Sequence, residues 1–277
     1  MSCPFHDDPN PSCSIYPDHF HCHGCGEHGG RLDWLIRAEG MTHAEAMLAI
    51  HDWTAPARRA SQNGGDRTNT YAFAMGLWTG AGELRGTIAE RYLAEPRGID
   101  VTRLPANVHD SLRFHPHCVF GAGTYLPCLI ALMRNPLTDA PVGIQRTALE
   151  ERNGKIEKID RRMLGHAGVV KLWPAGPRLI VGEGIETTLA AAMHIPYRGA
   201  PLQPAWAALS SGALGALPVI PGVEELIVLV DHDLNGAGQL AALRCSERWS
   251  RAGCRVVRLK PKRANSDFND LVMGAAS

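Results

Sequence analysis

Four cysteines and five histidines lie within residues 3–28, and this cluster constrains the fold more than any other feature of the chain. Cys3 and His6 form a C-x2-H pair, Cys22 and Cys25 form a C-x2-C pair, and fifteen residues separate the two pairs. Two short ligand pairs joined by a loop can wrap one tetrahedral ion, and thiolate and imidazole ligands favour zinc. We therefore predict a structural zinc site with the ligands Cys3, His6, Cys22 and Cys25.

Two other interpretations compete with the metal site, namely buried free cysteines and disulfides. No signal peptide precedes Cys3, and the four cysteines beyond residue 28 show no paired spacing. Such usage is typical of a reducing compartment, where clustered cysteines hold metal more often than they bridge. Further candidate ligands lie close to the two pairs and leave the assignment open; they are Cys13, His19, His21, His23 and His28.

The segment around the cluster is too short to build a large apolar core, so we expect metal binding to supply its folding free energy. Tyr16 and Phe20, with the neighbouring histidines, offer rings that could stack on nucleic-acid bases. The alternative is that Phe20 packs inside the metal-binding module.

Composition and charge set broad limits on the whole chain of 277 residues, whose length suits two or three small domains. The longest apolar run spans residues 125–133, far short of the roughly 20 residues that cross a membrane as a helix. The formal net charge is zero, but residues 146–178 and 244–263 each hold eight Lys or Arg residues and fewer acids. Basic patches on a neutral chain can bind phosphate, although one such run is more often a solvated surface.

The chain divides into regions of different pattern. Residues 1–55 hold the metal cluster and one amphipathic helix over residues 30–53, and residues 56–70 read as a polar linker. Residues 71–176 mix helical stretches, such as 82–95, with strand-like ones, such as "CLIALM" and "VGIQRTAL". From residue 177 to 277 apolar strands alternate with helices, which predicts an α/β domain with a mostly parallel sheet flanked by helices.

Acidic residues follow three of the predicted strands in this last region. Glu183 ends "RLIVGE", Asp231 and Asp233 end "ELIVLVDHD", and Asp267 and Asp270 lie in "DFND". Ligands of such sheets bind at the carboxyl ends of the strands, and clustered carboxylates repel one another unless a cation lies between them. Oxygen-only clusters suit Mg²⁺ or Mn²⁺. A single D-x-D is as often a helix cap or loop acid, but three acidic motifs at strand ends favour a metal site.

These motifs resemble known families over nearly the whole chain. "VGEGIETTL", "VLVDHDLNGAGQLAA" and "DFNDLV" resemble, in order and spacing, the Toprim domain shared by bacterial primases, topoisomerases and some nucleases. The Cys/His cluster resembles the zinc ribbon that begins DnaG-type primases. The segments "GTIAERYLAEPRGI", "SLRFHP", "VGIQRTALEERNGKIEKIDRRMLG" and "VVKLWP" look like the middle region of small Toprim primases from phages, plasmids and integrated elements. The expected architecture is a zinc ribbon, a mixed α+β middle subdomain and a Toprim domain.

The resemblance implies a bacterial, cytoplasmic DNA primase that joins nucleoside triphosphates into short RNA primers on single-stranded DNA, with a replicative helicase as a potential partner in trans. Catalysis would be metal-dependent nucleotidyl transfer with Mg²⁺ or Mn²⁺. Asp231 and Asp233 would hold the metal, Glu183 would act as a ligand or general base, and Asp267 and Asp270 would support them. Fixed cations would hold the triphosphate or the template; the candidates are Arg146, Arg161, Arg162 and Lys171.

The sequence departs from the DnaG-type pattern in three places. Only Met1 and Ser2 precede Cys3, where related ribbons have a helix and a strand, so either an edge strand is missing or the natural start lies upstream. Thr187 stands where DnaG-type primases have an acid, and Glu186 stands one residue earlier. Asn269 stands where they often have aspartate.

Other functions fit the same motifs. A Toprim nuclease would use the acids to activate water, but such enzymes generally work with a partner ATPase and this sequence has no Walker A motif. A topoisomerase would need a nucleophilic tyrosine on a further domain, and none of the five tyrosines stands in such a context. The last alternative is a DNA-binding accessory protein whose Toprim fold is a scaffold, against which the nearly complete set of acids argues.

Overall fold

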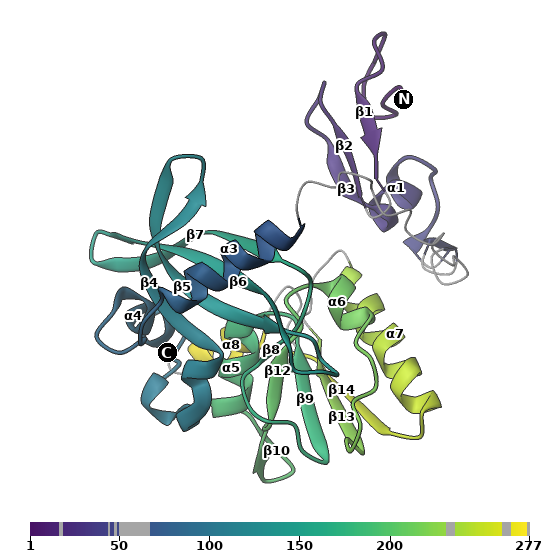
Figure 1. Ribbon diagram of the computed structural model, residues 1–277. Coiled ribbons are helices and arrows are strands. Elements are labelled where there is room, and N and C mark those ends of the chain that lie inside the picture. The colour runs from purple at the N-terminus through teal and green to yellow at the C-terminus, as the bar shows by residue number, and fades with distance from the viewer. Residues whose placement is uncertain are drawn as a thin grey trace. The chain divides into compact units, whose positions relative to one another are not determined.

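The computed structural model in Figure 1 describes residues 1–16, 19–43, 45–46, 49, 67–230, 236–261 and 267–275. The chain forms two compact units, Met1–Gly64 and Gly65–Ser277. Within the described part, no helix combines the length and the apolar character that a membrane crossing requires.

The first unit contains a small antiparallel sheet of strands β1 (Cys13–Ile15), β2 (His19–Cys22) and β3 (His28–Gly30), followed by helix α1 (Arg31–Arg37). Alternation along β2 buries Phe20 and Cys22 on one face and leaves His19 and His21 on the other. Phe20 packs against Phe5 and Trp34, with ring centroids 5.3 and 5.1 Å apart. Phe20 is therefore a core residue of the ribbon.

The single helix predicted for residues 30–53 is wrong at its C-terminal side. Helix α1 ends at Arg37, and Gly40 has a φ of 69°, which a continuing helix does not allow. After this break, Thr42 and Glu45 exchange capping-box hydrogen bonds, the device that starts a new helix. The predicted linker lies outside the described residues up to residue 66, and helix α3 (Arg67–Thr79) begins at Arg67.

The second unit begins with an antiparallel meander and its helices. The two central strands β5 and β6 are buried on both faces, and their side chains point alternately to two apolar clusters. Ile130 and Ile144 pack with α3, while Leu129 and Leu149 pack with α4. The elements are α4 (Ile88–Ala94), η1 (Val101–Arg103), η2 (Ala106–Asp110), β4 (Leu112–Gly121), β5 (Thr124–Arg134), β6 (Pro141–Arg152) and β7 (Lys155–Gly165), and the strands pair in chain order.

Helix α4 is shorter than the helix predicted for residues 82–95. It begins at Ile88 because Thr87 caps it: Thr87 Oγ1 accepts hydrogen bonds from the backbone N–H groups of Ala89 and Glu90. Before the cap, Gly82 forms an antiparallel bridge with Phe114, and residues 84–86 form a bend and a turn.

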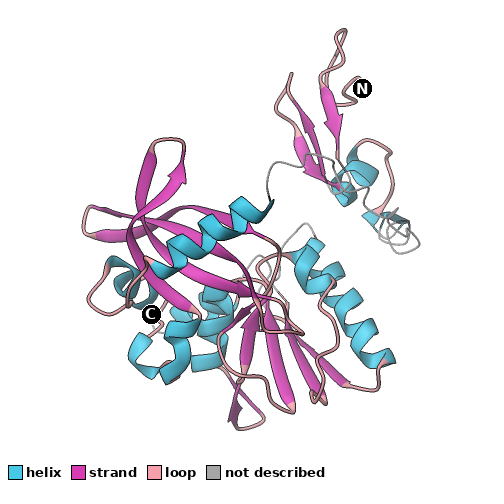
Figure 2. Cartoon of the chain, viewed as in Figure 1, coloured by secondary structure: helices cyan, strands magenta, loops and turns pink. Residues whose placement is uncertain are grey.

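The rest of the second unit is an α/β domain whose sheet also includes β8, from the segment that the sequence analysis assigned to the middle subdomain. Its sheet has the order β14-β13-β9-β12-β8, in which the first four strands run parallel and β8 is antiparallel. Figure 2 shows helices on both faces of this sheet. The remaining elements are β8 (Val170–Lys171), β9 (Arg178–Gly182), α5 (Ile185–His194), β10 (Pro196–Tyr197), β11 (Ala200–Pro201), β12 (Ala205–Ala207), α6 (Ser211–Gly215), β13 (Glu225–Leu229), α7 (Ala237–Arg251), β14 (Arg255–Leu259) and α8 (Phe268–Ala275).

Side chains of the central strand β9 alternate between the two layers of helices. Leu179 and Val181 lie in the cluster that includes α6 and α7, whereas Ile180 lies in the cluster that includes α5 and α8. Ile185 of α5 and Leu209, after β12, pack in the same cluster as Leu129 and Leu149 of the meander. The meander thus shares one apolar core with the end of the sheet where β9 and β12 terminate.

Candidate functional site

The four predicted zinc ligands come together in the first unit. One ligand atom from each of Cys3, His6, Cys22 and Cys25 lies within 4.8 Å of all the others. Cys3 Sγ and Cys25 Sγ are 3.8 Å apart, and Cys22 Sγ is 3.9 Å from His6 Nδ1. Zinc–sulfur bonds of about 2.3 Å at tetrahedral angles place two sulfurs about 3.8 Å apart, so these residues fit a zinc ion.

Hydrogen bonds prepare one of these thiols for a cation. Burial raises the pKa of Cys22, but bonds from Ser12 Oγ and from the backbone N–H groups of Cys25 and Gly24 outweigh it and lower the pKa to about 6. The pKa of Cys3 is raised by burial, despite the N–H of Phe5, which donates to its sulfur over 3.4 Å. Two neighbouring thiolates repel each other, and a bound cation would remove that conflict.

The sequence analysis missed the residues that hold the two ligand pairs in place. The buried carboxylate of Asp8 accepts hydrogen bonds from the N–H groups of Cys3, at 2.7 Å, and Ser12, at 3.0 Å, and a third bond from Ser12 Oγ. Ser12 Oγ in turn lies 3.3 Å from Cys22 Sγ. The sequence "HDDPNPSC" contains a recognisable pattern for these residues, because Asp, Asn and Pro together indicate a turn in which a side chain hydrogen-bonds to the backbone.

Cys13 lies beside Cys3 and Cys22 in the same buried cluster but is not one of the four grouped ligands. Cys13 is buried opposite Cys22 in the β1–β2 pair. Tyr16 is exposed and stacks on His19, with ring centroids 4.4 Å apart. His21 faces His28 across the β2–β3 pair.

Of the predicted acids of the second unit, Glu183 lies at the carboxyl end of β9, and Asp267 and Asp270 lie at the start of α8. Glu183 follows the last residue of β9, Gly182, which tolerates no side chain because a Cβ there would collide with Thr188 Oγ1 of α5. The close approach of α5 brings Thr187 to the start of α8, where its Oγ1 donates to Asp267 Oδ2 over 2.9 Å. Asp231 and Asp233 lie outside the described residues.

Asp267 and Asp270 also have a structural explanation. The N–H of Asp270 donates to Asp267 Oδ1 over 2.8 Å, and the N–H of Asp267 donates to Asp270 Oδ2 over 3.0 Å. This reciprocal arrangement is a capping box at the N-terminus of α8. Each carboxylate keeps a lone pair for a further contact, so the cap and a metal are compatible.

The four predicted phosphate-binding residues do not form one patch. Cross-strand pairing sets Arg146 opposite Arg162 and Thr147 opposite Arg161, so Arg161 points to the other face of the meander. Arg146 is buried and donates to Val119 O, whereas Arg162 donates to Phe120 O over 2.7 Å and pairs with Asp160. Arg161 is exposed.

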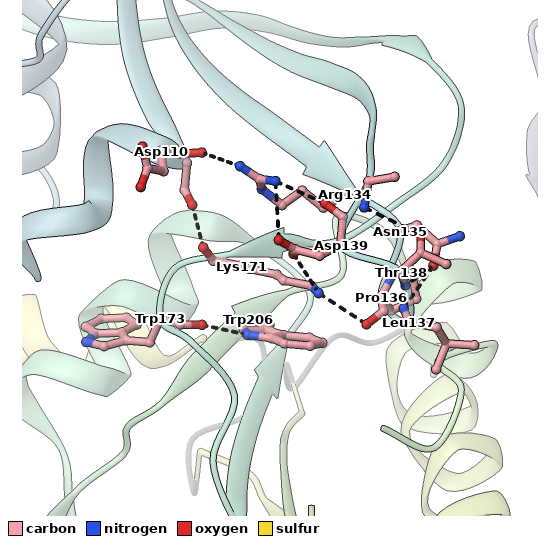
Figure 3. A network of polar contacts seen from close by, with 12 residues as sticks. Asp110, Arg134, Asn135, Pro136, Leu137, Thr138, Asp139, Lys171, Trp173 and Trp206 are labelled. Carbon is pink, nitrogen blue, oxygen red and sulfur yellow. Dashed lines mark hydrogen bonds and ion pairs between the residues drawn. The ribbon is translucent and has the colours of Figure 1, made fainter. Parts of the chain in front are cut away.

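Lys171 lies on β8 within a network of polar contacts (Figure 3). Its ammonium pairs with Asp139 Oδ1 at 2.8 Å, donates to Pro136 O at 3.2 Å and lies 4.5 Å from the ring centroid of Trp206. Asp139 also accepts from Arg134. The ammonium of Lys171 therefore ties β8 to the β5–β6 turn. A phosphate that binds this ammonium must share it with Asp139 and Pro136.

Comparison with known families and proteins adds the following similarities. The CHC2 zinc finger family matches residues 1–62, a domain of unknown function (DUF7146) matches residues 68–171, and the Toprim domain matches residues 178–277. A DNA primase of Chlamydia trachomatis is 48% identical over 50 residues, which cover 17% of this chain and 8% of that protein. A DNA primase of Listeria monocytogenes is 38% identical over 52 residues, which cover 18% of this chain and 8% of that protein.

Among solved structures, the zinc-binding and RNA polymerase domains of the Aquifex aeolicus primase match 99% of this chain and 75% of that chain. The identity is 17% and the TM-score is 0.46, a likeness too distant to assign any residue a role.

Proposed function

Since its CHC2 zinc finger and Toprim domain make this chain a member of the DnaG-type primase family, we propose that it synthesises short RNA primers on single-stranded DNA. The substrates would be nucleoside triphosphates and the template a single DNA strand. Both occur in the bacterial cytoplasm, where we place the protein, and its gene would belong to a phage, a plasmid or an integrated element. A replicative helicase would be a partner in trans.

One observation carries this proposal: residues from two separate acidic motifs meet at one end of the sheet. Glu183 follows the central strand β9, and Thr187, one turn further on, donates to Asp267 of the last motif. Acids gathered at the carboxyl ends of parallel strands are suited to hold Mg²⁺ or Mn²⁺. We assign the metal to Glu183, Asp231 and Asp233, with Asp267 and Asp270 supporting them.

The reaction would be an in-line transfer of a nucleotide to a 3′ hydroxyl. When bound, Mg²⁺ or Mn²⁺ would supply activation of that hydroxyl and compensation of the charge on the pyrophosphate that leaves. If Glu183 is not a metal ligand, it would be the general base that accepts the proton of the 3′ hydroxyl, since it is half-buried at the end of β9. Of the four basic candidates, Arg161 and Arg162 are exposed, and Arg162 is already bonded to Asp160 and Phe120 O. Arg161 is therefore the better placed to meet a DNA phosphate from solvent, whereas Arg146, Arg162 and Lys171 would act through their present contacts.

We propose a division of labour that follows the predicted boundaries. Residues 1–55 would hold zinc and contact the template, residues 71–176 would hold the nucleotide and the DNA backbone, and residues 177–277 would carry the acids. The zinc would be structural, because three thiolates and an imidazole fill all four positions of a tetrahedron and leave none for a substrate.

A non-catalytic accessory protein remains the second candidate, and the capping box favours it. Asp267 and Asp270 are explained by helix capping alone, so these two acids would be present in a scaffold as well. The distinction therefore rests on Glu183, Asp231 and Asp233.

The decisive experiment supplies purified protein with four ribonucleotides, Mg²⁺ and a mixed-sequence single-stranded template. We expect labelled RNA of a few nucleotides from the parent protein and none from Glu183→Gln, purified identically to exclude a contaminating polymerase. Cleavage of the template without RNA synthesis would identify a nuclease. Binding of the template with neither product would identify an accessory protein.

A further inference from the structure

A buried hydrogen bond links helix α4 to the first turn of α5. Tyr92 of α4 is 1% exposed, and its hydroxyl donates to Glu186 Oε1 over 2.8 Å. Glu186 is 8% exposed and lies in the first turn of α5, three residues after Glu183. Burial and the charge of Glu186 raise the pKa of Tyr92, so its hydroxyl remains a donor at neutral pH.

A second contact links the turn that follows α4 to α8. Asn269 is 2% exposed; its Nδ2 donates to Arg97 O over 2.7 Å, and Arg97 Nη1 donates back to Asn269 Oδ1 over 3.2 Å. The Arg97 guanidinium lies 5.6 Å from the ring centroid of Tyr92, which joins the two contacts. We call Tyr92, Arg97, Glu186 and Asn269 the clamp.

The turn that carries Arg97 is itself fixed between the two helices. Gly98 O accepts a hydrogen bond from His194 Nε2 at the end of α5, at 2.8 Å. Gly98 has a φ of 67°, and a Cβ at this position would lie 3.3 Å from Met273 Sδ of α8. The chain between α4 and η1 thus contacts α5 and α8 together.

The clamp lies directly beside the acids. Glu186 follows Glu183 by three residues, and Asn269 stands between Asp267 and Asp270. Before a metal binds, neighbouring carboxylates repel one another, and this repulsion pushes the starts of α5 and α8 apart. The bond from Thr187 to Asp267 opposes that separation, and the clamp adds buried hydrogen bonds that act in the same direction.

We propose that the clamp positions the catalytic acids, with Glu186 as a positioning residue that accepts from Tyr92 rather than as a metal ligand. The inference rests on the proposed metal-dependent function. It assigns to α4 and the turn after it, within residues 71–176, a task beyond nucleotide binding: keeping Glu183 and Asp267 at the separation that a metal requires. Catalytic geometry tolerates deviations of only about 0.5 Å, so loss of the clamp would affect the reaction more than the binding of substrate.

Three variants separate the roles. Tyr92→Phe removes one hydroxyl and keeps the ring, Glu186→Gln keeps an oxygen that accepts from Tyr92, and Glu183→Gln removes a proposed ligand. Ser246→Ala is the matched control, because its buried Oγ donates to Ala242 O over 2.7 Å in α7, away from the clamp.

For Tyr92→Phe we expect kcat to fall about tenfold, with KM for nucleotides unchanged and a higher Mg²⁺ concentration at half-maximal rate. Glu186→Gln should keep kcat within about threefold of the parent, since the hydrogen bond survives. Ser246→Ala should lower the melting temperature without changing kcat. Parental kcat in Tyr92→Phe, or a loss in Glu186→Gln as large as in Glu183→Gln, would overturn the inference.

A measurement without metal tests the clamp independently of activity. In metal-free protein, Tyr92→Phe should speed amide hydrogen exchange in the first turns of α5 and α8, and Ser246→Ala should not. If the parent makes no RNA, the proposed function fails, but faster exchange and weaker Mg²⁺ binding by Tyr92→Phe, measured with the metal alone, would still support the clamp. Parental exchange and parental Mg²⁺ affinity in Tyr92→Phe would refute it, as would a parent that binds no Mg²⁺.

Discussion

The zinc ribbon and the sheet of the second unit differ in how their proposed metal ligands relate to the apolar core. The ribbon core consists of Cys3, Cys13, Phe20 and Cys22, with Phe5 and Trp34 packed against it, so two of its four buried residues are also metal ligands. Glu183 and Asp267 instead lie beside large apolar clusters, which include the nearby residues Ile185 and Phe268. On the assignments proposed here, zinc would be part of the fold of the ribbon, whereas the metal held by the acids would serve only the chemistry.

Removal of zinc tests this contrast with the largest expected effect. Cys22→Ser with Cys25→Ser should abolish zinc binding and unfold residues 1–49, because structural zinc contributes about 10 kcal/mol or more to such modules. Metal analysis and hydrogen exchange should show the loss in the first unit, while the second unit melts as before. Cys13→Ala is the control, since it removes a buried cysteine outside the ligand set and should keep the zinc. Full zinc content in the double variant would refute the ligand assignment.

Removal of an acid should abolish activity without unfolding the protein, in contrast to removal of zinc, which should unfold the first unit. Asp231→Ala and Asp233→Ala should each lower primer synthesis at least about a hundredfold, a loss typical of a missing electrostatic contact in the transition state. Without magnesium each variant should melt at the parental temperature or slightly above it, because like-charge repulsion is relieved.

Magnesium should stabilise the parent more than these two variants, since only the intact folded site binds it tightly. Thermal melts with and without magnesium provide the measurement. Variants that melt markedly lower in both conditions yet still make primers would show that these acids are structural.

Asp267 allows the structural and chemical roles to be separated at one position. Asp267→Ala should lose the cap of α8 and cost about 0.5–2 kcal/mol, while Asp267→Asn should keep most of that stability because asparagine also caps helices. If the carboxylate supports the metal, both variants should lose activity. Parental activity in Asp267→Asn, measured beside its denaturation curve, would leave Asp267 with the cap alone.

The smallest effect concerns two arginines on opposite faces of the meander. Arg161→Ala should weaken binding of single-stranded DNA and reduce the dependence of log K on log salt by about 0.7, the value for one phosphate contact. Arg146→Ala should instead lower the free energy of unfolding, since the buried guanidinium donates to Val119 O. Titrations at several salt concentrations and urea denaturation distinguish them. An affinity that does not change with salt would contradict the electrostatic argument.

The sequence alone determined the features that depend on spacing and period. The C-x2-H and C-x2-C pairs predicted the group of four zinc ligands, which lies within 4.8 Å in the structure. Alternating strands and helices predicted a mostly parallel sheet, and the acid after "RLIVG" placed Glu183 at the end of its central strand. Metal-ligand pairs and strand alternation act over a few residues, so a linear pattern records them.

Only the tertiary structure decided the features that join distant segments. The bond between Tyr92 and Glu186 spans 94 positions, and that between Arg97 and Asn269 spans 172, so neither leaves a local pattern. The predicted helix over residues 30–53 failed at Gly40, because helical periodicity does not reveal a left-handed residue. The burial of Arg146 depends on which face of the meander α3 covers, and that choice is made by packing between elements rather than by the properties of any one of them.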